Sequence, residues 1–487
     1  MTRSRSPGSA WVAFGGGLVA DPSDADPLRV GGKAAGLITM SALGLAVPPG
    51  VVLALGVTDD ELDDLVRVAV RELERMTERR LGDEARPLLV SVRSGAAQSM
   101  PGMLDTLLDL GVTPAVVDGL ARTTGDAAFA EDTWSRCRSG WAEVVGGAPP
   151  EDPVEQVVEA ARAVLRSWNG QRARAFRVAE DLDGALGTSV TIQAMVFGNL
   201  GPDSGAGVVF SRDPSTGVAG MVGDLLVGGQ GVDVVGGDHT PSPLSELAQR
   251  WPSVHRELAA AVETLERHHS DMVDVEFTVE EGRLFLLQCR PGRRTPAAAA
   301  RIAVEMAEDP SIPLDRPAAV SRCRHLLDGP AERVAATPVA AADRDVLVRG
   351  LAASPGRGTG VLVVSVDEAL RRHDAGEPVV LVRPTTSPTD VAAMAVASGI
   401  VTTRGGIVSH AAVVARSWGL PAVVGATELE VTEHGVVVAG RTVAEGETVT
   451  VDGDSGALLA GAQSAAGVAG SPELELLRRW ASELDEP

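Results

Sequence analysis

Short runs of β-branched and aliphatic residues alternate with helical segments along most of this chain, and glycine or proline separates them. The runs typical of buried strands are PLLVSV (87–92), SVTIQAMVF (189–197) and GVVFS (207–211). Apolar residues recur at helical spacing near 59–76, 114–122 and 153–167. Two further runs in 272–290 predict a β-hairpin that turns at Glu281-Gly282. This alternation favours an α/β (α+β) fold over an all-helical or all-strand one.

A chain of 487 residues is too long for one hydrophobic core, and about 150 residues per domain suggests two to four domains. The composition changes at 296–345, where an Ala/Arg-rich helical pattern interrupted by prolines predicts a connector. Short strands with glycines then recur, together with a helix near 409–418 and a closing amphipathic stretch, SPELELLRRWASEL. The expected divisions are 1–295, 296–345, 346–462 and a tail at 463–487.

Charge and composition exclude several classes of function. A net charge of −23 argues against binding to nucleic acid or to an anionic membrane, because such surfaces need Lys and Arg to neutralise phosphates. No run of about 18 apolar residues is present, so no membrane span is expected. The three cysteines show neither paired nor metal-site spacing, which fits a reducing compartment. We interpret the apolar start as a first strand, not a signal peptide, and expect a cytoplasmic protein.

Lys33, in RVGGKAAGL (29–37), is the only lysine, whereas the other 42 of the 43 basic residues are arginines. An ammonium group is a compact, mobile point charge, and a guanidinium group is a planar fork. The single preserved lysine therefore indicates a role that an ammonium group fills and a guanidinium group does not. The alternative is that this lysine was spared by chance.

A histidine at the start of a predicted helix lies within TTRGGIVSHAAVVARSWGLPAVVG (402–425). Ser409 is placed to cap that helix, and His410 falls in its first turn, beside unpaired N–H groups. This position favours an anion, so a phosphoryl group on the imidazole would be stabilised. Arg404 could pair with its oxygens. The alternative is a capping or core histidine.

The stretch around His410 closely resembles the phosphohistidine signature of the pyruvate phosphate dikinase family of PEP-utilising enzymes. The preceding LVRPTTSPTDVAAMAVASGIV and GLAASPGRGTG (350–360) resemble the rest of that family's swivelling domain. RVGGKAAGL, VSVRSGAAQSMPGMLDTLLDLG (90–111) and TIQAMVFGN resemble its nucleotide domain, in the same order. The resemblance implies an ATP-grasp-like nucleotide-binding domain, a linker and a smaller swivelling β/α phosphohistidine domain.

The resemblance also implies which residues bind ATP. Lys33 would contact the phosphates, and Arg93 would clamp them in a bidentate manner. The backbone around Ser99, Met100 and Gly102 would cradle the terminal phosphates. The remaining nucleotide positions are Gln193 and Met195, on a strand beside the adenine with backbone hydrogen bonds to its edge, and the weaker match Asp233. This strand is also expected to form part of the hydrophobic core, and a core role is compatible with the nucleotide role.

The hairpin would supply the metal and charge-stabilising groups. Glu276 and Gln288 offer oxygen ligands for Mg²⁺, with Asp274 one strand period away, and Arg290 would stabilise the transferring charge. Charged residues on a hairpin are otherwise simply solvated. Two positions depart from the family. Val232 replaces an acid, and Val408 replaces a threonine, which excludes the regulatory phosphorylation found there in plant members.

The expected activity is ATP-dependent pyrophosphorylation and phosphorylation of His410, with AMP and, from inorganic phosphate, pyrophosphate released. The family's TIM barrel for pyruvate and phosphoenolpyruvate has no counterpart before residue 487, so we expect a barrel on another chain. One alternative is a PEP-synthase-like or small-molecule phosphotransferase that uses the same histidine. A second is a non-catalytic nucleotide-sensing protein.

Overall fold

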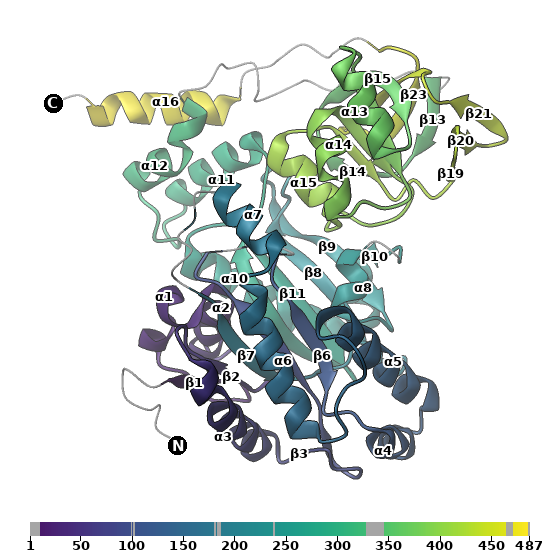
Figure 1. Ribbon diagram of the computed structural model, residues 1–487. Helices are drawn as coiled ribbons and strands as arrows, with labels where there is room; N and C mark the ends of the chain where they lie inside the picture. Colours follow the sequence, from purple (N-terminus) through teal and green to yellow (C-terminus); the bar gives the residue numbers. More distant parts are fainter. Residues whose placement is uncertain are drawn as a thin grey trace. The chain divides into compact units, whose positions relative to one another are not determined.

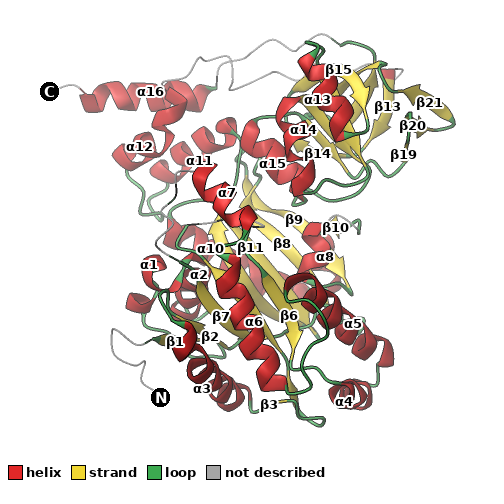
Figure 2. Cartoon of the chain, in the orientation of Figure 1, coloured by secondary structure: helices red, strands yellow, loops and turns green. Residues whose placement is uncertain are grey.

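The computed structural model describes residues 10–98, 100, 103–179, 182, 187–236, 239–327, 345–463 and 471–485. It divides the chain into two compact units. The first unit comprises Met1–Ser204 and Phe277–Cys289, and the second comprises Gly205–Glu276 and Arg290–Pro487. Both units mix strands and helices, which confirms the predicted α/β class (Figures 1 and 2). The domain limits expected from the sequence stay predictions.

A five-stranded sheet forms the centre of the first unit, in the order β1-β2-β7-β5-β6. Its strands are β1 (Trp11–Phe14), β2 (Gly50–Leu53), β5 (Val90–Gly95), β6 (Thr106–Leu110) and β7 (Ser189–Ala194). Neighbouring strands are antiparallel, and Gln193 of β7 is paired with Gly50 on one side and Ser91 on the other. All six residues of β7 are buried, as expected for a central strand.

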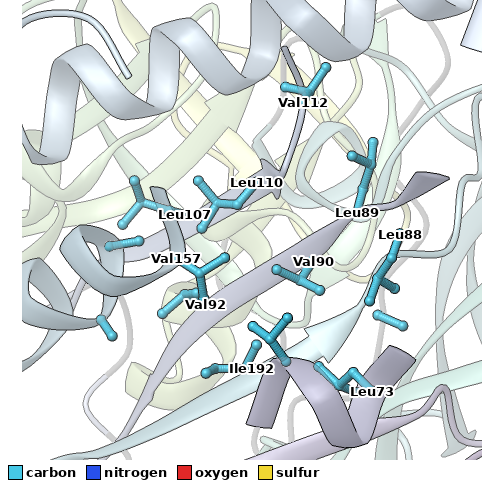
Figure 3. Packing of buried hydrophobic residues seen from close by; sticks show 14 of the residues in the cluster. Leu73, Leu88, Leu89, Val90, Val92, Leu107, Leu110, Val112, Val157 and Ile192 are labelled. Atoms are coloured by element: carbon cyan, nitrogen blue, oxygen red, sulfur yellow. The ribbon is translucent and has the colours of Figure 1, made fainter. Parts of the chain in front are cut away.

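Helices α3 (Asp59–Thr77) and α6 (Pro153–Ser167) pack on this sheet. Figure 3 shows their Leu73 and Val157 among Val90, Val92 and Ile192 of the strands. The other elements of the unit are α1 (Pro27–Val30), α2 (Gly32–Ala42), α4 (Pro114–Thr124), α5 (Ala127–Val144), α7 (Gln171–Ala179) and the short pair β3 (Arg80–Leu81) and β4 (Pro87–Leu88). The core is Val, Leu, Ile and Ala with few aromatic rings, as the composition requires.

A second five-stranded sheet has the order β10-β9-β8-β11-β12. Its strands are β8 (Gly205–Arg212), β9 (Ala219–Val227), β10 (Ser242–Pro243), β11 (Val273–Glu280) and β12 (Arg283–Pro291). The accompanying helices are α8 (Gly231–Gly236), α9 (Glu246–Arg250) and α10 (Pro252–His269). β11 and β12 form the predicted hairpin, and Glu281 and Gly282 turn it with φ of 48° and 75°. Two positive φ values are typical of a tight two-residue hairpin turn.

Three helices of the second unit pack together in an apolar cluster that also includes Val208 and Phe210 of β8. They are α11 (Pro296–Glu308), α12 (Arg316–Leu327) and α16 (Pro472–Asp485). Leu474, Leu477 and Trp480 of α16 are buried against α11 and α12, and the guanidinium of Arg316 lies 4.8 Å from the Trp480 ring centroid. The closing amphipathic stretch is therefore a helix that covers the predicted connector. The connector residues 328–344 lie outside the described residues.

Residues 345–463 form a body around an eight-stranded sheet, in the order β13-β23-β22-β15-β16-β17-β18-β14. Its strands are β13 (Val346–Arg349), β14 (Leu351–Ser354), β15 (Arg357–Val363), β16 (Val379–Arg383), β17 (Ala397–Thr402), β18 (Ala422–Val424), β22 (Thr448–Asp452) and β23 (Ala457–Ala460). The run from β15 to β18 is parallel. Its helices are α13 (Val366–Asp374), α14 (Val391–Val396) and α15 (His410–Trp418), and β19 (Leu429–Thr432), β20 (Gly435–Val438) and β21 (Arg441–Ala444) form a small sheet.

Three predicted helices, near 59–76, 114–122 and 153–167, are confirmed as α3, α4 and α6. α5 and α10, each of 18 residues, had no counterpart in the prediction. Among the described helices, none combines the length and the apolar character that a membrane span requires.

Candidate phosphohistidine site

His410 is the first residue of α15, and parallel strands place it there. β17 and β18 are parallel neighbours, so the chain between them must cross over, and α15 is that crossover. The helix therefore begins at the edge of the sheet where the parallel strands end, which is where ligands bind in such sheets. Ala411, Ala412 and Ala415 are buried against the strands, so the helix holds a fixed position.

The loop before His410 turns on Gly405, with φ of 94°, a value at which a side chain would be strained. Ser409 is the N-cap residue by position, but its hydroxyl makes no capping hydrogen bond, so that part of the prediction is wrong. Its Oγ atom is instead buried without a hydrogen-bond partner. A buried hydroxyl with free capacity, beside the N–H groups of a helix start, is suited to a phosphoryl oxygen.

His410 lines a small cavity together with Arg404, Ser409 and Thr386. Thr386 follows β16, and its Oγ1 atom lies 3.2 Å from Nδ1 of His410. If Nδ1 carries the proton, it donates to Thr386 and the lone pair of Nε2 faces away from this contact. Arg404 is exposed at the surface end of the cavity, where an arginine can reach phosphoryl oxygens.

Burial lowers the pKa of His410 below its ordinary value, and the charge of Asp390 opposes this shift. The imidazole is consequently neutral near pH 7, which is the nucleophilic form. Asp390 is itself fixed, because its Oδ2 atom accepts the N–H of Ser387 and its Oδ1 atom lies 3.1 Å from Nε of Arg383.

A carboxylate from β9 holds the loop before His410. Asp224 Oδ2 accepts the N–H of Val408 at 2.9 Å. A Cβ atom at Gly406 would lie 2.0 Å from the same oxygen, so only glycine permits this approach. Burial raises the pKa of Asp224 to about 6, and the backbone N–H of Val408 opposes the rise. The close approach of Asp224 to the loop thus explains why the residue after Gly405 is also a glycine.

Arg416 holds the same loop from within α15. It is almost fully buried, and it donates to the carbonyls of Ala353 and Ile407 at 2.9 and 2.7 Å. Its guanidinium lies 5.5 Å from the ring centroid of Phe210 on β8. Burial lowers its pKa to about 10, and the charges of nearby aspartates oppose the change. Arg416 therefore remains a cation at neutral pH.

In the first unit, Lys33 is exposed in the first turn of α2. Gly31 precedes the helix with φ of 80°, and a Cβ atom there would lie 2.1 Å from the carbonyl oxygen of Gly95. The Ser189 hydroxyl donates to the Gly95 carbonyl. The N–H of Gly32 donates to the Ala96 carbonyl. The start of α2 is thereby fixed against the end of β5, the strand that carries Arg93.

Arg93 is half-buried on β5, paired with Thr106 on one side and Thr191 on the other. Met100 is buried in an apolar cluster with Trp168 and Ala173, so its side chain serves packing. Ser99 and Gly102, the other predicted phosphate-loop positions, lie outside the described residues. Their contact with phosphate stays a prediction.

Gln193 is buried in the middle of the sheet, and its Nε2 atom donates to the Pro48 carbonyl. The N–H groups of Ala194 and Met195 donate to the carbonyls of Pro49 and Leu89. These two N–H groups are therefore used within the fold, and the predicted backbone hydrogen bonds from this stretch to an adenine edge stay a prediction. Gln193 and Met195 as nucleotide positions otherwise stay predictions.

Asp233 lies in the first turn of α8, where its Oδ2 atom accepts the N–H of Gln230 at 2.8 Å. This contact fixes the turn into α8. A role for Asp233 toward a nucleotide stays a prediction.

The acidic end of β11 offers oxygen donors for a hard cation. Asp274 Oδ2 accepts from Nε of Arg290 at 2.8 Å, while its Oδ1 is buried without a hydrogen-bond partner. Burial raises the pKa of Asp274, and Arg290 opposes the rise. Glu276 is half-buried two residues farther along the strand. The described residues contain no ready-made cluster of three or more acidic, His or Cys ligands. The unpaired Asp274 oxygen and Glu276 nevertheless fit Mg²⁺, which keeps several waters and binds substrate phosphates.

The sequence reasoning missed Thr386 and Arg416. The sequence did contain an indication for Arg416, because its position in α15 falls on the buried, alanine-rich face of the helix. A cation that is buried there needs carbonyl or acidic groups around it. The sequence contained no such indication for Thr386, because 24 residues separate it from His410 and only the parallel strand order brings them together.

Comparisons with known proteins match two family models and several curated proteins. The family described as "Pyruvate phosphate dikinase, AMP/ATP-binding domain" matches residues 56–254 and 245–310, and "PEP-utilising enzyme, mobile domain" matches residues 375–456. The chain is 38% identical to the chloroplastic pyruvate, phosphate dikinase of Flaveria pringlei, over 93% of this chain and 54% of that protein. It is also 38% identical to pyruvate, phosphate dikinase of Rhizobium meliloti (strain 1021), over 93% of this chain and 58% of that protein.

Among solved structures, "N-terminal domain of Enzyme 1 - Nitrogen" is 26% identical over 22% of this chain and 38% of that chain. Its TM-score of 0.13 carries no argument about the fold. The chain spans little more than half the length of the curated relatives named above.

Proposed function

This chain belongs to the pyruvate phosphate dikinase family, and on that premise we propose that it transfers phosphoryl groups from ATP to its own His410. The observation that supports this most strongly is the set of contacts around the imidazole. Thr386 orients the ring, and the unpartnered Ser409 hydroxyl at the start of α15 lines the same cavity. A histidine needed only for packing would not require an anion-binding environment.

In the first step, the Nε2 lone pair attacks the β-phosphorus of ATP. An N–P bond forms, the bond from the β-phosphorus to the bridging oxygen breaks, and AMP leaves with that oxygen. The Nδ1 proton stays in place, donating to Thr386, and the nearby carboxylate of Asp390 stabilises the positive charge on the ring. The lowered pKa of His410 keeps the attacking nitrogen unprotonated at neutral pH.

In the second step, an oxygen of inorganic phosphate attacks the terminal phosphorus. The bond from that phosphorus to the oxygen that bridges it to the β-phosphorus breaks, the bridging oxygen stays on the β-phosphoryl group, and pyrophosphate departs, leaving phospho-His410. The N–H groups at the start of α15 and the Ser409 hydroxyl would bind the remaining phosphoryl oxygens, with Arg404 at the exposed end. These groups stabilise a dianion better than they stabilise a neutral imidazole, so they favour the phosphorylated form.

The other assigned residues act on the nucleotide. Lys33 and Arg93 would neutralise phosphate charge in the first unit, and Arg290 would do so in the second. Asp274 Oδ1, Glu276 and Gln288 would hold Mg²⁺, which when bound withdraws charge from the phosphates. Ser99, Met100, Gly102, Gln193, Met195 and Asp233 complete the proposed nucleotide set.

The final acceptor belongs to the same proposal. The curated relatives are named for pyruvate and phosphate, and we propose that phospho-His410 transfers its phosphoryl group to pyruvate, giving phosphoenolpyruvate. A TIM barrel on another chain would bind the pyruvate. Transfer to water in a synthase-like reaction, or to another small molecule, is the competing outcome.

ATP labelled separately at the β and γ positions tests the mechanism. Wild type should take up acid-labile, base-stable label and release AMP, whereas His410→Asn should do neither. His373→Asn, which changes an exposed histidine of the same body, serves as the matched control. ADP as the sole nucleotide product would contradict the proposal. Adding phosphate then separates the two reaction types, because only the dikinase reaction releases pyrophosphate.

A further inference from the structure

Five arginines line an open cavity of about 840 Å³ at the end of α3 and in the loop that follows it. We refer to this cavity as the arginine bowl; its arginines are Arg71, Arg75, Arg79, Arg80 and Arg86. All five are exposed, and the cavity lies wholly within the first unit. None of the residues assigned to nucleotide or phosphoryl transfer lines it.

The acids of the bowl are largely occupied in shaping its rim. Glu74 accepts the N–H of Leu81 at 3.1 Å. Asp83 accepts the N–H groups of Ala85 and Arg86 at 2.7 and 2.8 Å, and these bonds lower its pKa. These hydrogen bonds fix the loop, and the charges of Arg80 and Arg86 also act on the Asp83 carboxylate.

Among the described residues, ion pairs engage only two of the five arginines. Arg75 pairs with Glu72 outside the cavity lining, and Arg86 meets the exposed Glu78 only at 3.8 Å. Within the described residues, Arg71 and Arg80 form no ion pair with an acid. The bowl therefore contains five cations against three acids, in a chain whose net charge is −23.

We propose that the arginine bowl binds a small polyanion that presents at least two oxyanion groups, of phosphate or carboxylate type. A guanidinium group offers paired N–H donors that match both groups, and its charge does not titrate near neutral pH. The cavity volume lies within the range of small-molecule sites, which is about 300–1,000 Å³. Like charges held together at one surface repel, so a bound polyanion relieves an energetic cost that the free protein bears.

Arg79 has an additional role in the fold. Its charge lowers the pKa of Glu280, which burial raises, and the Glu280 carboxylate accepts the N–H of Phe197. Phe197 follows the end of β7, so replacing Arg79 would disturb the neighbourhood of the proposed nucleotide strand. Arg71 and Arg80 are the better positions to change, because they line the bowl and have no such link to Glu280; the charge of Arg80 acts on Asp83, an acid of the bowl itself.

The test is calorimetric titration of the full chain, at an ionic strength of about 20 mM so that screening is weak, with tripolyphosphate and with citrate as separate probes. The bowl variant is R71Q/R80Q. The matched control is R67Q/R166Q, which removes the same charge from exposed positions of α3 and α6 outside the bowl. Thermal unfolding of each variant verifies that it is folded.

Lys33→Ala is titrated in parallel with tripolyphosphate, since that probe also resembles the phosphates of the proposed nucleotide site. Tripolyphosphate binding that is weakened in R71Q/R80Q and unchanged in Lys33→Ala is assigned to the arginine bowl. Failure of the nucleotide proposal is thereby distinguished from failure of this one.

Affinity for at least one probe should fall about tenfold or more in R71Q/R80Q and change less than about threefold in the control. Binding of tripolyphosphate alone would identify a phosphate ligand, and binding of citrate alone a carboxylate ligand. Equal weakening in the control, no binding of either probe to wild type at millimolar concentration, or loss in Lys33→Ala alone would overturn the proposal.

Discussion

The carboxylate of Asp224 and the backbone N–H of Val408 form a hydrogen bond of 2.9 Å, although 184 residues separate them in sequence. The bond joins the sheet of β8 and β9 to the loop that precedes His410. Val408 adds its buried side chain to the apolar cluster that contains Val208 and Phe210. This docked loop leads directly into α15 and so places His410.

Replacing Gly406 with alanine should displace the docked loop, because the new Cβ atom would meet Asp224 Oδ2 at 2.0 Å. A misfit of this kind costs about 1–3 kcal/mol, so phosphorylation of His410 should slow by roughly tenfold or more. The measurement is single-turnover incorporation of label from ATP. Gly140→Ala on α5, where no atom lies within 4 Å of the new Cβ, should leave the rate unchanged. Normal labelling of the Gly406 variant would show that docking at this point is not needed.

Thr386→Val should slow labelling of His410 without weakening ATP binding, because the ring loses its hydrogen-bond partner at Nδ1. We expect a loss of roughly tenfold to a hundredfold, the size typical of a misoriented general base or nucleophile. Thr386→Ser keeps the hydroxyl and should restore most of the rate. A serine variant as slow as the valine variant would indicate that the methyl group, not the hydroxyl, holds the ring.

Asp109→Asn should stabilise the protein at alkaline pH. Asp109 is buried on β6 with neither carboxylate oxygen hydrogen-bonded, and burial raises its pKa from 3.8 to about 7. The pKa of Asp109 is higher in the folded protein than in the unfolded chain, so the free energy of unfolding falls as the pH rises from 3.8 to about 7. Above that window the loss is on the order of 4 kcal/mol. Asparagine removes this cost and tolerates the positive φ of 58°.

The gain from Asp109→Asn should be largest near pH 8, smaller at pH 5 and absent below pH 4, as followed by thermal unfolding. Asp118→Asn, at an exposed position of α4, is the control and should show no such pH dependence. If the gain in stability did not vary with pH, it would arise from packing and not from the charge of Asp109.

Lys33→Arg should weaken ATP binding by about tenfold or more, although it keeps the positive charge. The reason is shape, because a planar fork replaces a point charge at the start of α2. Equilibrium binding with a fluorescent ATP analogue measures the effect, and Lys33→Met shows the cost of losing the charge entirely. Arg67→Lys on α3 is the control. Wild-type affinity in Lys33→Arg would mean that charge alone is sufficient.

Local patterns predicted much of the fold, and non-local contacts account for what they missed. The short apolar runs identified β5, β7 and β8, and the Glu281-Gly282 pair identified the hairpin turn, because each signal is complete within a few residues. α5 and α10 escaped prediction, although α10 carries a regular apolar stripe through Leu258 and Leu265. The buried face of α5 mixes Phe129, Thr133, Cys137 and Trp141, so no uniform aliphatic stripe marks that helix in the sequence.

The site shows the same division. His410, Arg404 and Ser409 lie together in one short motif, and the structure brings all three to one cavity. Thr386 follows β16, a strand that only the fold brings next to the His410 motif. The docking role of Asp224 depends on a contact between elements that are far apart in the chain. The use of the Ala194 and Met195 N–H groups within the sheet also became evident only from the strand order.

The exposed position of Lys33 has a practical consequence. It carries the only side-chain primary amine in the chain, and it lies at the first turn of α2. An amine-reactive ester under mild conditions therefore has one internal target, and mass spectrometry of a single peptide reports on it. If ATP covers this amine, acylation slows in proportion to occupancy, so one chemical footprint measures nucleotide binding in the unmodified protein.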